Sequence, residues 1–359
     1  MQFIAINYPV YAIYFRPGDF ARRSGLEPLA EAVGAHKITH GCFWRAGRRV
    51  NWRVEEALKR WGQSYYGSQW NYLAPVWDEV RIARRMTERP SVAHFLFAEF
   101  AGPRRAAPFR ARGARVVGTF HASPRRQPVV SAGAHLEAYD CISVVARSQR
   151  SFFEARGYPA ERIFVTLHGV DTDYFQPDWN RAEAPTDRPL RGLLVGSTER
   201  DHSLMASVMK SLPRDCLQLD VATKPNPHPA YTGLANVNML PHLDDAALLR
   251  AYQQADILVM PLLDATANNA LLEAMACGTP VLTNRTSGTA DYVDGSGGVV
   301  VEEHTVEAWV AAIRALASDR AGLQARRAPA RAWAERLSWA SVAPQYHALY
   351  AAAMKDVAT

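Results

Sequence analysis

The sequence has few of the residues that cross-link small domains or span membranes. Its four cysteines are scattered and form no CxxC pair, which argues against a zinc site and against a disulfide framework. No run approaches the ~20 apolar residues that a membrane-spanning helix needs. The first fifteen residues lack the basic region and the small-residue cleavage site of a signal peptide. We therefore expect a protein of the reducing cytoplasm.

Repeats and nucleic-acid signatures are also missing. No period of ~20–50 residues recurs, which argues against a solenoid or a propeller. The sequence has no aromatic RNA-binding signature and no basic tract, so we expect no nucleic-acid partner. What is present is ordinary for a globular protein, with 48% hydrophobic and 21% charged residues. At ~100–200 residues per domain, 359 residues favour two domains.

Lysine is scarce and positive charge is unevenly spread. Only five of the 41 basic residues are lysines, and the formal net charge is +6. Residues 1–178 hold 25 basic and 16 acidic residues, whereas residues 179–359 hold 16 and 19. Two explanations stay open: an Ala- and Arg-rich genomic composition, or contact with an anionic membrane surface.

Short apolar runs alternate with amphipathic stretches along the whole chain, which predicts parallel sheets covered by helices on both faces. In the first half the runs are Phe3–Val10, Val92–Phe97, Arg115–Phe120, Cys141–Val145 and Ile163–His168. In the second half they are Gly192–Gly196, Leu217–Ala222, Ile257–Pro261, Val281–Asn284 and Gly298–Val301. Helices are expected at Ser203–Ser211, Asp244–Gln254, Asn269–Cys277 and Val306–Ser318.

The two series are separated by a polar, proline-containing stretch at 177–190. The pattern therefore predicts an α/β protein with two doubly wound domains, one at residues 1–178 and one at residues 179–335. The remaining residues, 336–359, are predicted to form a C-terminal helix that returns to the first domain.

The segment 257–281 combines a strand, a polar turn and a helix that Gly278 and Pro280 stop. It places a helix N-terminus at the carboxyl end of a parallel strand, where unpaired N–H groups suit a diphosphate. Thr266, Asn268 and Asn269 can cap the helix. An ordinary capped crossover helix remains the alternative.

The run from Glu273 to Val281, EAMACGTPV, resembles the signature of the retaining glycosyltransferases of family 4. The resemblance implies the GT-B fold, in which two Rossmann-like domains face each other across a cleft. It also implies a nucleotide-sugar donor and retention of anomeric configuration without a metal. The family's ribose-binding glutamate falls on Glu273, and its first glutamate falls on Ala265.

The resemblance also indicates which residues contact the phosphates and the sugar of the donor. The family's phosphate-turn glycine falls on Asn268. We expect that turn and Asp264 to take over the sugar and phosphate contacts, with donor-binding residues Thr266, Asn268, Asn269 and Ala270.

Further segments extend the resemblance over nearly the whole chain. Residues 193–196 are similar to the first strand and loop of the family's second domain, which places Gly196 at the donor. Arg200 is the expected phosphate-binding cation, and His202 stands where the family has a lysine. Lys224 is a candidate for a second positive charge.

In the first domain, His121 ends an apolar strand and resembles the family histidine that faces the donor sugar and phosphate. Glu99 ends the preceding strand and is a candidate for the acceptor side. Gly25 and Arg23 are similar to the small-residue loop near the phosphates, Gly25 as a donor contact and Arg23 on the acceptor side. The predicted catalytic set is therefore His121, Arg200, Asp264 and Glu273.

We expect a retaining glycosyltransferase that moves a sugar from a UDP- or GDP-linked donor to a hydroxyl of a glycan, glycolipid or small molecule, in cell-surface glycan or glycolipid synthesis. In the family the departing diphosphate draws the acceptor's proton, so no carboxylate nucleophile is needed. No metal or further cofactor is expected. The location expected is cytoplasmic, with peripheral contact on the inner membrane. An epimerase or phosphorylase on the same fold, or a non-catalytic binding subunit, are the alternatives.

Overall fold

The computed structural model describes residues 9–14, 26–39, 57, 60, 86, 90–100, 103–130, 136–181 and 188–355. The chain divides into two compact units. The first unit consists of residues 1–168 and 342–359, and the second unit consists of residues 169–341. The boundaries predicted from the sequence, after residues 178 and 335, separate folding domains. This division into compact units does not test them, so they stay predictions.

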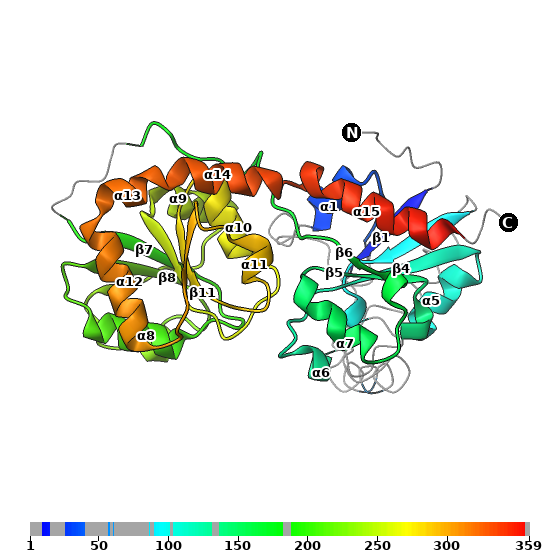
Figure 1. The fold of residues 1–359 in the computed structure, drawn as a ribbon, viewed down its shortest axis with the longest axis horizontal. Helices are drawn as coiled ribbons and strands as arrows, with labels where there is room; N and C mark the ends of the chain where they lie inside the picture. The colour runs from blue at the N-terminus through cyan, green and yellow to red at the C-terminus, as the bar shows by residue number, and fades with distance from the viewer. Residues whose placement is uncertain are drawn as a thin grey trace. The chain divides into compact units, whose positions relative to one another are not determined.

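The second unit is built on six parallel strands in the order β12-β11-β10-β7-β8-β9 (Figure 1). The strands are β7 (Leu190–Val195), β8 (Leu217–Ala222), β9 (Val237–Met239), β10 (Ile257–Met260), β11 (Val281–Asn284) and β12 (Gly298–Val301). The chain winds outward from β7 in one direction and from β10 in the other. The loops that follow these two strands therefore diverge, which opens a ligand-binding position at the carboxyl ends of the strands.

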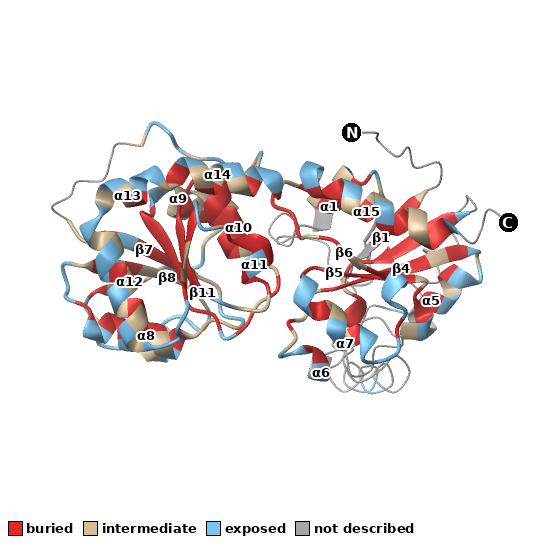
Figure 2. Ribbon diagram, viewed as in Figure 1, coloured by how far each residue is buried: buried red, intermediate tan, exposed pale blue. Residues whose placement is uncertain are grey.

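Helices cover both faces of this sheet. They are α8 (His202–Ser211), α9 (Asp245–Gln254), α10 (Asn269–Ala276), α11 (Thr289–Tyr292), α12 (Val306–Ser318), α13 (Arg320–Ala325) and α14 (Arg327–Arg336). On one face, Trp309 of α12 and Met205 of α8 join a core cluster with the sheet. On the other face lies α10, whose residues are buried from Ala270 to Ala276, as Figure 2 shows. A helix that is enclosed on all sides is fixed in place by its packing.

The first unit also has a parallel sheet, in the order β2-β1-β3-β4-β5-β6. Its strands are β1 (Val10–Tyr14), β2 (His36–Thr39), β3 (Ser91–Phe95), β4 (Ala114–Phe120), β5 (Cys141–Val144) and β6 (Ile163–Val165). Its helices are α1 (Leu26–Ala32), α5 (Pro103–Arg110), α6 (Gln127–Val130) and α7 (Arg150–Glu154), joined by α15 (Trp339–Met354) from Val342 onward.

A buried histidine attaches the C-terminal helix to the sheet of the first unit. His94 of β3 has its Nδ1 2.9 Å from the Tyr350 hydroxyl of α15 and its Nε2 2.7 Å from the Thr119 hydroxyl of β4. Burial lowers the pKa of His94 to about 3, so its ring is neutral. A neutral imidazole can donate one of these hydrogen bonds and accept the other.

Most predicted elements lie where the structure has them, with differences at the sheet edges. The edge strands β2 and β9 escaped prediction because their sequences, HKIT and VNM, contain polar residues and so form no apolar run. The first strand is Val10–Tyr14, whereas the prediction was Phe3–Val10, most of which lies outside the described residues. Its register follows from pairing with β3, where Val10 lies opposite Val92.

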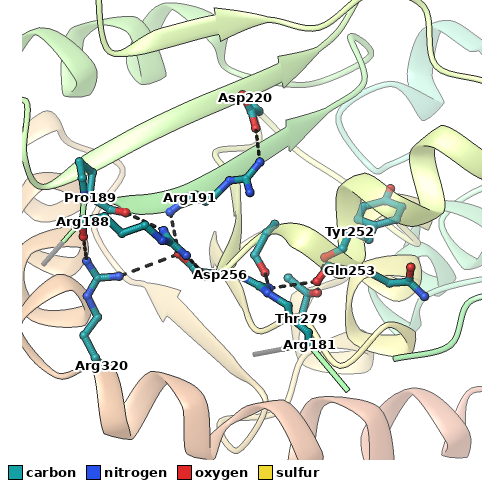
Figure 3. A network of polar contacts seen from close by, with 11 residues as sticks. Arg181, Arg188, Pro189, Arg191, Asp220, Tyr252, Gln253, Asp256, Thr279 and Arg320 are labelled. Carbon is teal, nitrogen blue, oxygen red and sulfur yellow. Dashed lines mark hydrogen bonds and ion pairs between the residues drawn. The ribbon is translucent and has the colours of Figure 1, made fainter. Parts of the chain in front are cut away.

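Asp256, which precedes β10, is the centre of a polar network in the second unit (Figure 3). Its carboxylate accepts hydrogen bonds from Arg181 at 2.6 Å, from Arg188 at 2.8 Å and from the backbone N–H of Arg191 at 2.8 Å. Burial by itself would raise the pKa of Asp256, but the hydrogen bonds from Arg188 and Arg191 lower it overall. The network thus attaches Arg181 and Arg188, on either side of segment 182–187, to the start of β10.

We expect Asp256→Asn to lower the free energy of unfolding of the second unit by about 3 kcal/mol, because it leaves partly buried arginines without their counter-charge. Since the folded-state pKa is depressed, the stabilisation is present above the ordinary aspartate pKa and is lost as the pH falls through the folded value. Urea unfolding at several pH values measures this. A difference between wild type and variant that does not shrink in acid would contradict it.

Candidate functional site

Two loops meet where the strand order of the second unit reverses. The loop after β7 is joined to the loop after β10 by backbone hydrogen bonds, from Asp201 N–H to the Pro261 carbonyl and from Leu263 N–H to the Glu199 carbonyl, both 2.9 Å. Adjacent parallel strands end at the same sheet edge, so loops that follow them can pair in this way. The pairing fixes the backbone on which Arg200 stands.

Arg200 lies flat against the backbone of the first loop. Its Nε donates to the Val195 carbonyl at 3.0 Å and its Nη1 to the Thr198 carbonyl at 2.6 Å. Gly196 makes this possible, because a Cβ there would come within 2.9 Å of the guanidinium, and its φ of +96° favours glycine. Partial burial lowers the pKa of Arg200, while Tyr252 and Glu273 nearby act to raise it. Glu199 also acts to raise it, and among the described residues the hydrogen bonds of Arg200 go to neutral oxygens.

The third donor of Arg200 points to the start of α10. Its Nη2 lies 3.3 Å from Oδ1 of Asn268, the N-cap residue of that helix. The same oxygen accepts from the backbone N–H groups of Ala270 at 3.1 Å and Leu271 at 3.4 Å. A guanidinium and the N–H groups of a helix's first turn therefore converge on one point, an arrangement that suits an anion.

Glu273 lies one turn deeper in α10, almost fully buried. Its Oε2 accepts a hydrogen bond of 2.7 Å from the hydroxyl of Tyr252 in α9. Burial, and then the adjacent Glu273 carboxylate, raise the pKa of Tyr252 well above its ordinary value, so the phenol keeps its proton and can only donate here. The structure thus holds the predicted ribose-binding carboxylate in one orientation.

Asp264 shapes the turn before α10. Its Oδ1 accepts from the N–H groups of Ala265 at 2.9 Å and Ser287 at 3.0 Å, which ties the turn to the loop after β11. Gly288 of that loop passes so close to the carbonyl of Thr266 that no Cβ would fit. The carboxylate of Asp264 is therefore used to hold the loop together, and its predicted contact with the sugar stays a prediction.

His202 and Lys224 lie near the same strand ends. His202 begins α8, where its Nδ1 is 2.8 Å from the Tyr231 hydroxyl and its Nε2 is 3.2 Å from the Gly196 carbonyl. Burial lowers the pKa of His202 to about 4, so this position carries no positive charge at neutral pH. Lys224 is exposed, two residues beyond β8.

A second polar group gathers at the carboxyl ends of β3 and β4 in the first unit. Glu99 Oε1 accepts from the backbone N–H groups of His121 and of Ala122, the latter at 2.7 Å. The His121 ring lies 4.5 Å from the Phe97 ring and 6.0 Å from the His168 ring, between centroids. Burial and then His168 lower the pKa of His121 well below its ordinary value, which keeps it neutral.

Three side chains of this region carry buried polar atoms without a hydrogen-bond partner among the described residues. They are Oε2 of Glu99, Oγ of Ser123 and both amide atoms of Gln127. Each such atom costs free energy unless something pairs with it. Burial raises the pKa of Glu99 to about 7, the backbone hydrogen bonds opposing it only in part. The region thus combines a carboxyl group that titrates near neutrality with hydroxyl and amide groups.

The structure brings together most of the predicted donor-site residues of the second unit. Gly196, Arg200, Asn268 and Ala270 meet through the contacts above, and Glu273 follows in the same helix. The donor-binding and catalytic roles predicted for these residues stay predictions, as do those of Thr266, Asn269 and Lys224 and, in the first unit, of Glu99 and His121. Arg23 and Gly25 lie outside the described residues.

Sequence reasoning missed Tyr252, His168, Ser123 and Gln127. Tyr252 lies one helix away from its partner Glu273, and no local pattern links the two. His168 is the last residue of the predicted run Ile163–His168 and lies three residues beyond β6 (Ile163–Val165) in the structure, so its place at a strand end could have been noticed.

No described helix is long and apolar enough to cross a bilayer. In the part of the chain that the structure describes, no three His, Cys, Asp or Glu side chains gather as metal ligands would. Metal independence and membrane contact remain predictions.

Known proteins resemble this chain in sequence and in fold. The family model for "Glycosyl transferases group 1" matches residues 192–319, which include the donor-site loops and α10. Over 332 residues the chain is 27% identical to a D-inositol 3-phosphate glycosyltransferase of Thermobispora bispora, covering 90% of this chain and 72% of that one. It is 34% identical over 326 residues to a protein of the same name from Rhodococcus opacus, covering 87% of this chain and 66% of that one. This chain belongs to the GT4-type glycosyltransferases.

Solved structures agree about the fold of this glycosyltransferase. A glycosyltransferase from Rickettsia africae superposes with a TM-score of 0.70 at 13% identity, over 97% of this chain and 99% of that one. Anabaena HepE in complex with UDP-glucose gives 0.70 at 13% identity, over 96% and 99%. At such low identity these likenesses show the fold alone. The predicted GT-B fold, with two Rossmann-like units, is thereby confirmed. The predicted enzyme class is confirmed by the family model and the sequence relatives.

Glu99 provides a pH test of the first unit. Its pKa is about 7 in the folded glycosyltransferase against an ordinary value of 4.5, so the folded state binds the proton more tightly. The stabilisation is complete below about pH 4.5 and is lost as the pH rises to about 7. Glu99→Gln does not titrate, so relative to it the wild type should lose up to about 3 kcal/mol of unfolding free energy over this range.

Urea unfolding of both proteins from pH 4.5 to 8 measures the difference. Glu161→Gln, at an exposed position of the same unit, is the control and should show no such trend. A difference between wild type and Glu99→Gln that is the same at every pH would show that Glu99 is not held protonated.

Proposed function

We propose that this glycosyltransferase takes its sugar from a nucleotide diphosphate, UDP or GDP, and binds that donor on the second unit. The observation that supports the proposal is Arg200, a partly buried cation whose hydrogen bonds, among the described residues, go to neutral oxygens. A partly buried charge without a hydrogen-bonded counter-charge is costly. The diphosphate of the donor would supply the counter-charge, and the α10 N-terminus would add hydrogen-bond donors.

The remaining donor contacts follow from this placement. Glu273, held by Tyr252, is the proposed acceptor of hydrogen bonds from the ribose hydroxyls. Gly196 lets the backbone and Arg200 approach the phosphates closely. Support for a UDP-linked donor comes from the fold relative HepE, whose structure was solved with UDP-glucose.

The acceptor would bind to the first unit, near Glu99 and His121. Glu99, Ser123 and Gln127 have buried polar atoms without a hydrogen-bond partner among the described residues. The hydroxyls of a polyol or sugar could form hydrogen bonds with these atoms. The relatives named D-inositol 3-phosphate glycosyltransferase make a phosphorylated small polyol the first acceptor to try. A glycan or glycolipid of the cell surface is the other class to include.

The proposed reaction retains the anomeric configuration. As the bond from the anomeric carbon to the diphosphate oxygen breaks, negative charge grows on that oxygen, and Arg200 with the α10 N–H groups stabilises it. The departing diphosphate accepts the proton of the acceptor hydroxyl, whose oxygen forms the new bond on the same face. Neutral His121 is proposed to hydrogen-bond the sugar during this step.

The first test is donor binding and turnover. Calorimetry with UDP and GDP, followed by turnover of the matching donor sugars, should show binding by the wild type. Arg200→Lys should lower kcat/KM about 100-fold or more, because a lysine cannot replace the guanidinium's three-way hydrogen bonding. Arg191→Lys, at the opposite end of β7, is the matched control and should leave turnover unchanged. Equal turnover by wild type and Arg200→Lys would refute the donor site.

The second test is stereochemical. With an α-linked donor and an accepted polyol, NMR of the first-formed product should show an α linkage. A β-linked product would exclude retention while leaving the donor site intact. Interconversion of the donor sugar without any acceptor would instead identify an epimerase.

A further inference from the structure

The side chain of Asn268 occupies the point on which the donor site's positive groups converge. Its Oδ1 accepts from Arg200 Nη2, from Ala270 N–H and from Leu271 N–H, at 3.3, 3.1 and 3.4 Å. Asn268 is almost fully buried, at 5% exposure. One neutral oxygen thus holds the hydrogen-bond donors that the proposed function gives to the diphosphate.

We propose that Asn268 is an internal stand-in for a phosphate oxygen, and that the donor binds by displacing its side chain. The inference builds on the proposed donor site. It makes Asn268 a residue that sets donor affinity by competition.

The bond lengths support an exchange of this kind. The hydrogen bonds to Oδ1 from Arg200 and Leu271, at 3.3 and 3.4 Å, are longer than the ~2.7–3.2 Å usual for N–H···O bonds, so these two are weak. A phosphate oxygen carries charge, and charge-assisted bonds from a guanidinium or helix N–H groups are shorter and about twice as strong. The exchange therefore replaces contacts to a neutral oxygen by stronger contacts to a charged one.

The surrounding structure stays in place without the side chain of Asn268. Its backbone carbonyl also accepts from the N–H groups of Leu271 at 3.1 Å and Leu272 at 3.2 Å, so the first turn of α10 remains attached. Arg200 keeps its bonds to the Val195 and Thr198 carbonyls. The proposed exchange requires the Asn268 side chain to rotate away from this position.

Two substitutions at this residue give opposite expectations. Asn268→Gly removes the competing oxygen, and glycine is tolerated at a helix N-cap. It should bind UDP, GDP and inorganic pyrophosphate about 10-fold more tightly than the wild type. Asn268→Asp also caps the helix well, but its carboxylate pairs with Arg200 and repels the diphosphate, so it should bind these probes at least 10-fold more weakly.

Calorimetry on the full chain measures both effects. Asp244→Gly removes the N-cap side chain of the neighbouring helix α9, whose Oδ1 accepts from Ala247 N–H at 2.7 Å. This control should leave the affinity for all three probes unchanged. It separates the effect of losing a helix cap from the effect of losing the oxygen that competes with phosphate. Pyrophosphate confines the comparison to the phosphate contacts, since it has neither base nor ribose.

The outcomes separate this inference from the proposed function. Tighter binding by Asn268→Gly together with weaker binding by Asn268→Asp supports it. Equal or weaker binding by Asn268→Gly overturns it, and if Arg200→Lys still weakens UDP binding the donor site stands. If wild type and Asn268→Gly bind none of the three probes, both the inference and the donor site are wrong.

Discussion

One partly buried cation organises the second unit of this glycosyltransferase. Arg200 can lie against the β7 loop only because residue 196 is a glycine, and it reaches the α10 N-terminus only because the loops after β7 and β10 pair through their backbones. Those loops are neighbours because the strand order reverses between β7 and β10. Strand order and loop conformation thus place the positive charge of Arg200 beside the α10 N-terminus. An anionic ligand compensates a charge at this place.

The two units use their strand ends differently. The second unit gathers N–H groups and a guanidinium, which is suited to phosphate chemistry. The first unit gathers a neutral His121 and a Glu99 whose pKa burial raises to about 7. Hydroxyl-bearing ligands fit such groups better than anions do. The division agrees with a donor on one unit and an acceptor on the other, as we propose.

Much of the fold could be read from the sequence because buried parallel strands are short apolar runs. The runs at Leu217–Ala222 and Val281–Asn284 coincide with β8 and β11 to the residue. The helix that begins at Asn269 was found through its capping residue and the Gly278 stop, which has a φ of +66° in the structure. The strands that were missed, β2 and β9, contain polar residues and so do not stand out as apolar runs.

The sequence by itself determined the order of elements, the family resemblance and the residue types of the donor loop, since these depend on local pattern and spacing. Only the tertiary structure decided which groups touch. It paired Tyr252 with Glu273, used Asp264 to hold a neighbouring loop, and set Asn268 between Arg200 and α10. Such contacts join residues up to 68 positions apart, and they arise from strand order and helix packing, which no local stretch of sequence encodes.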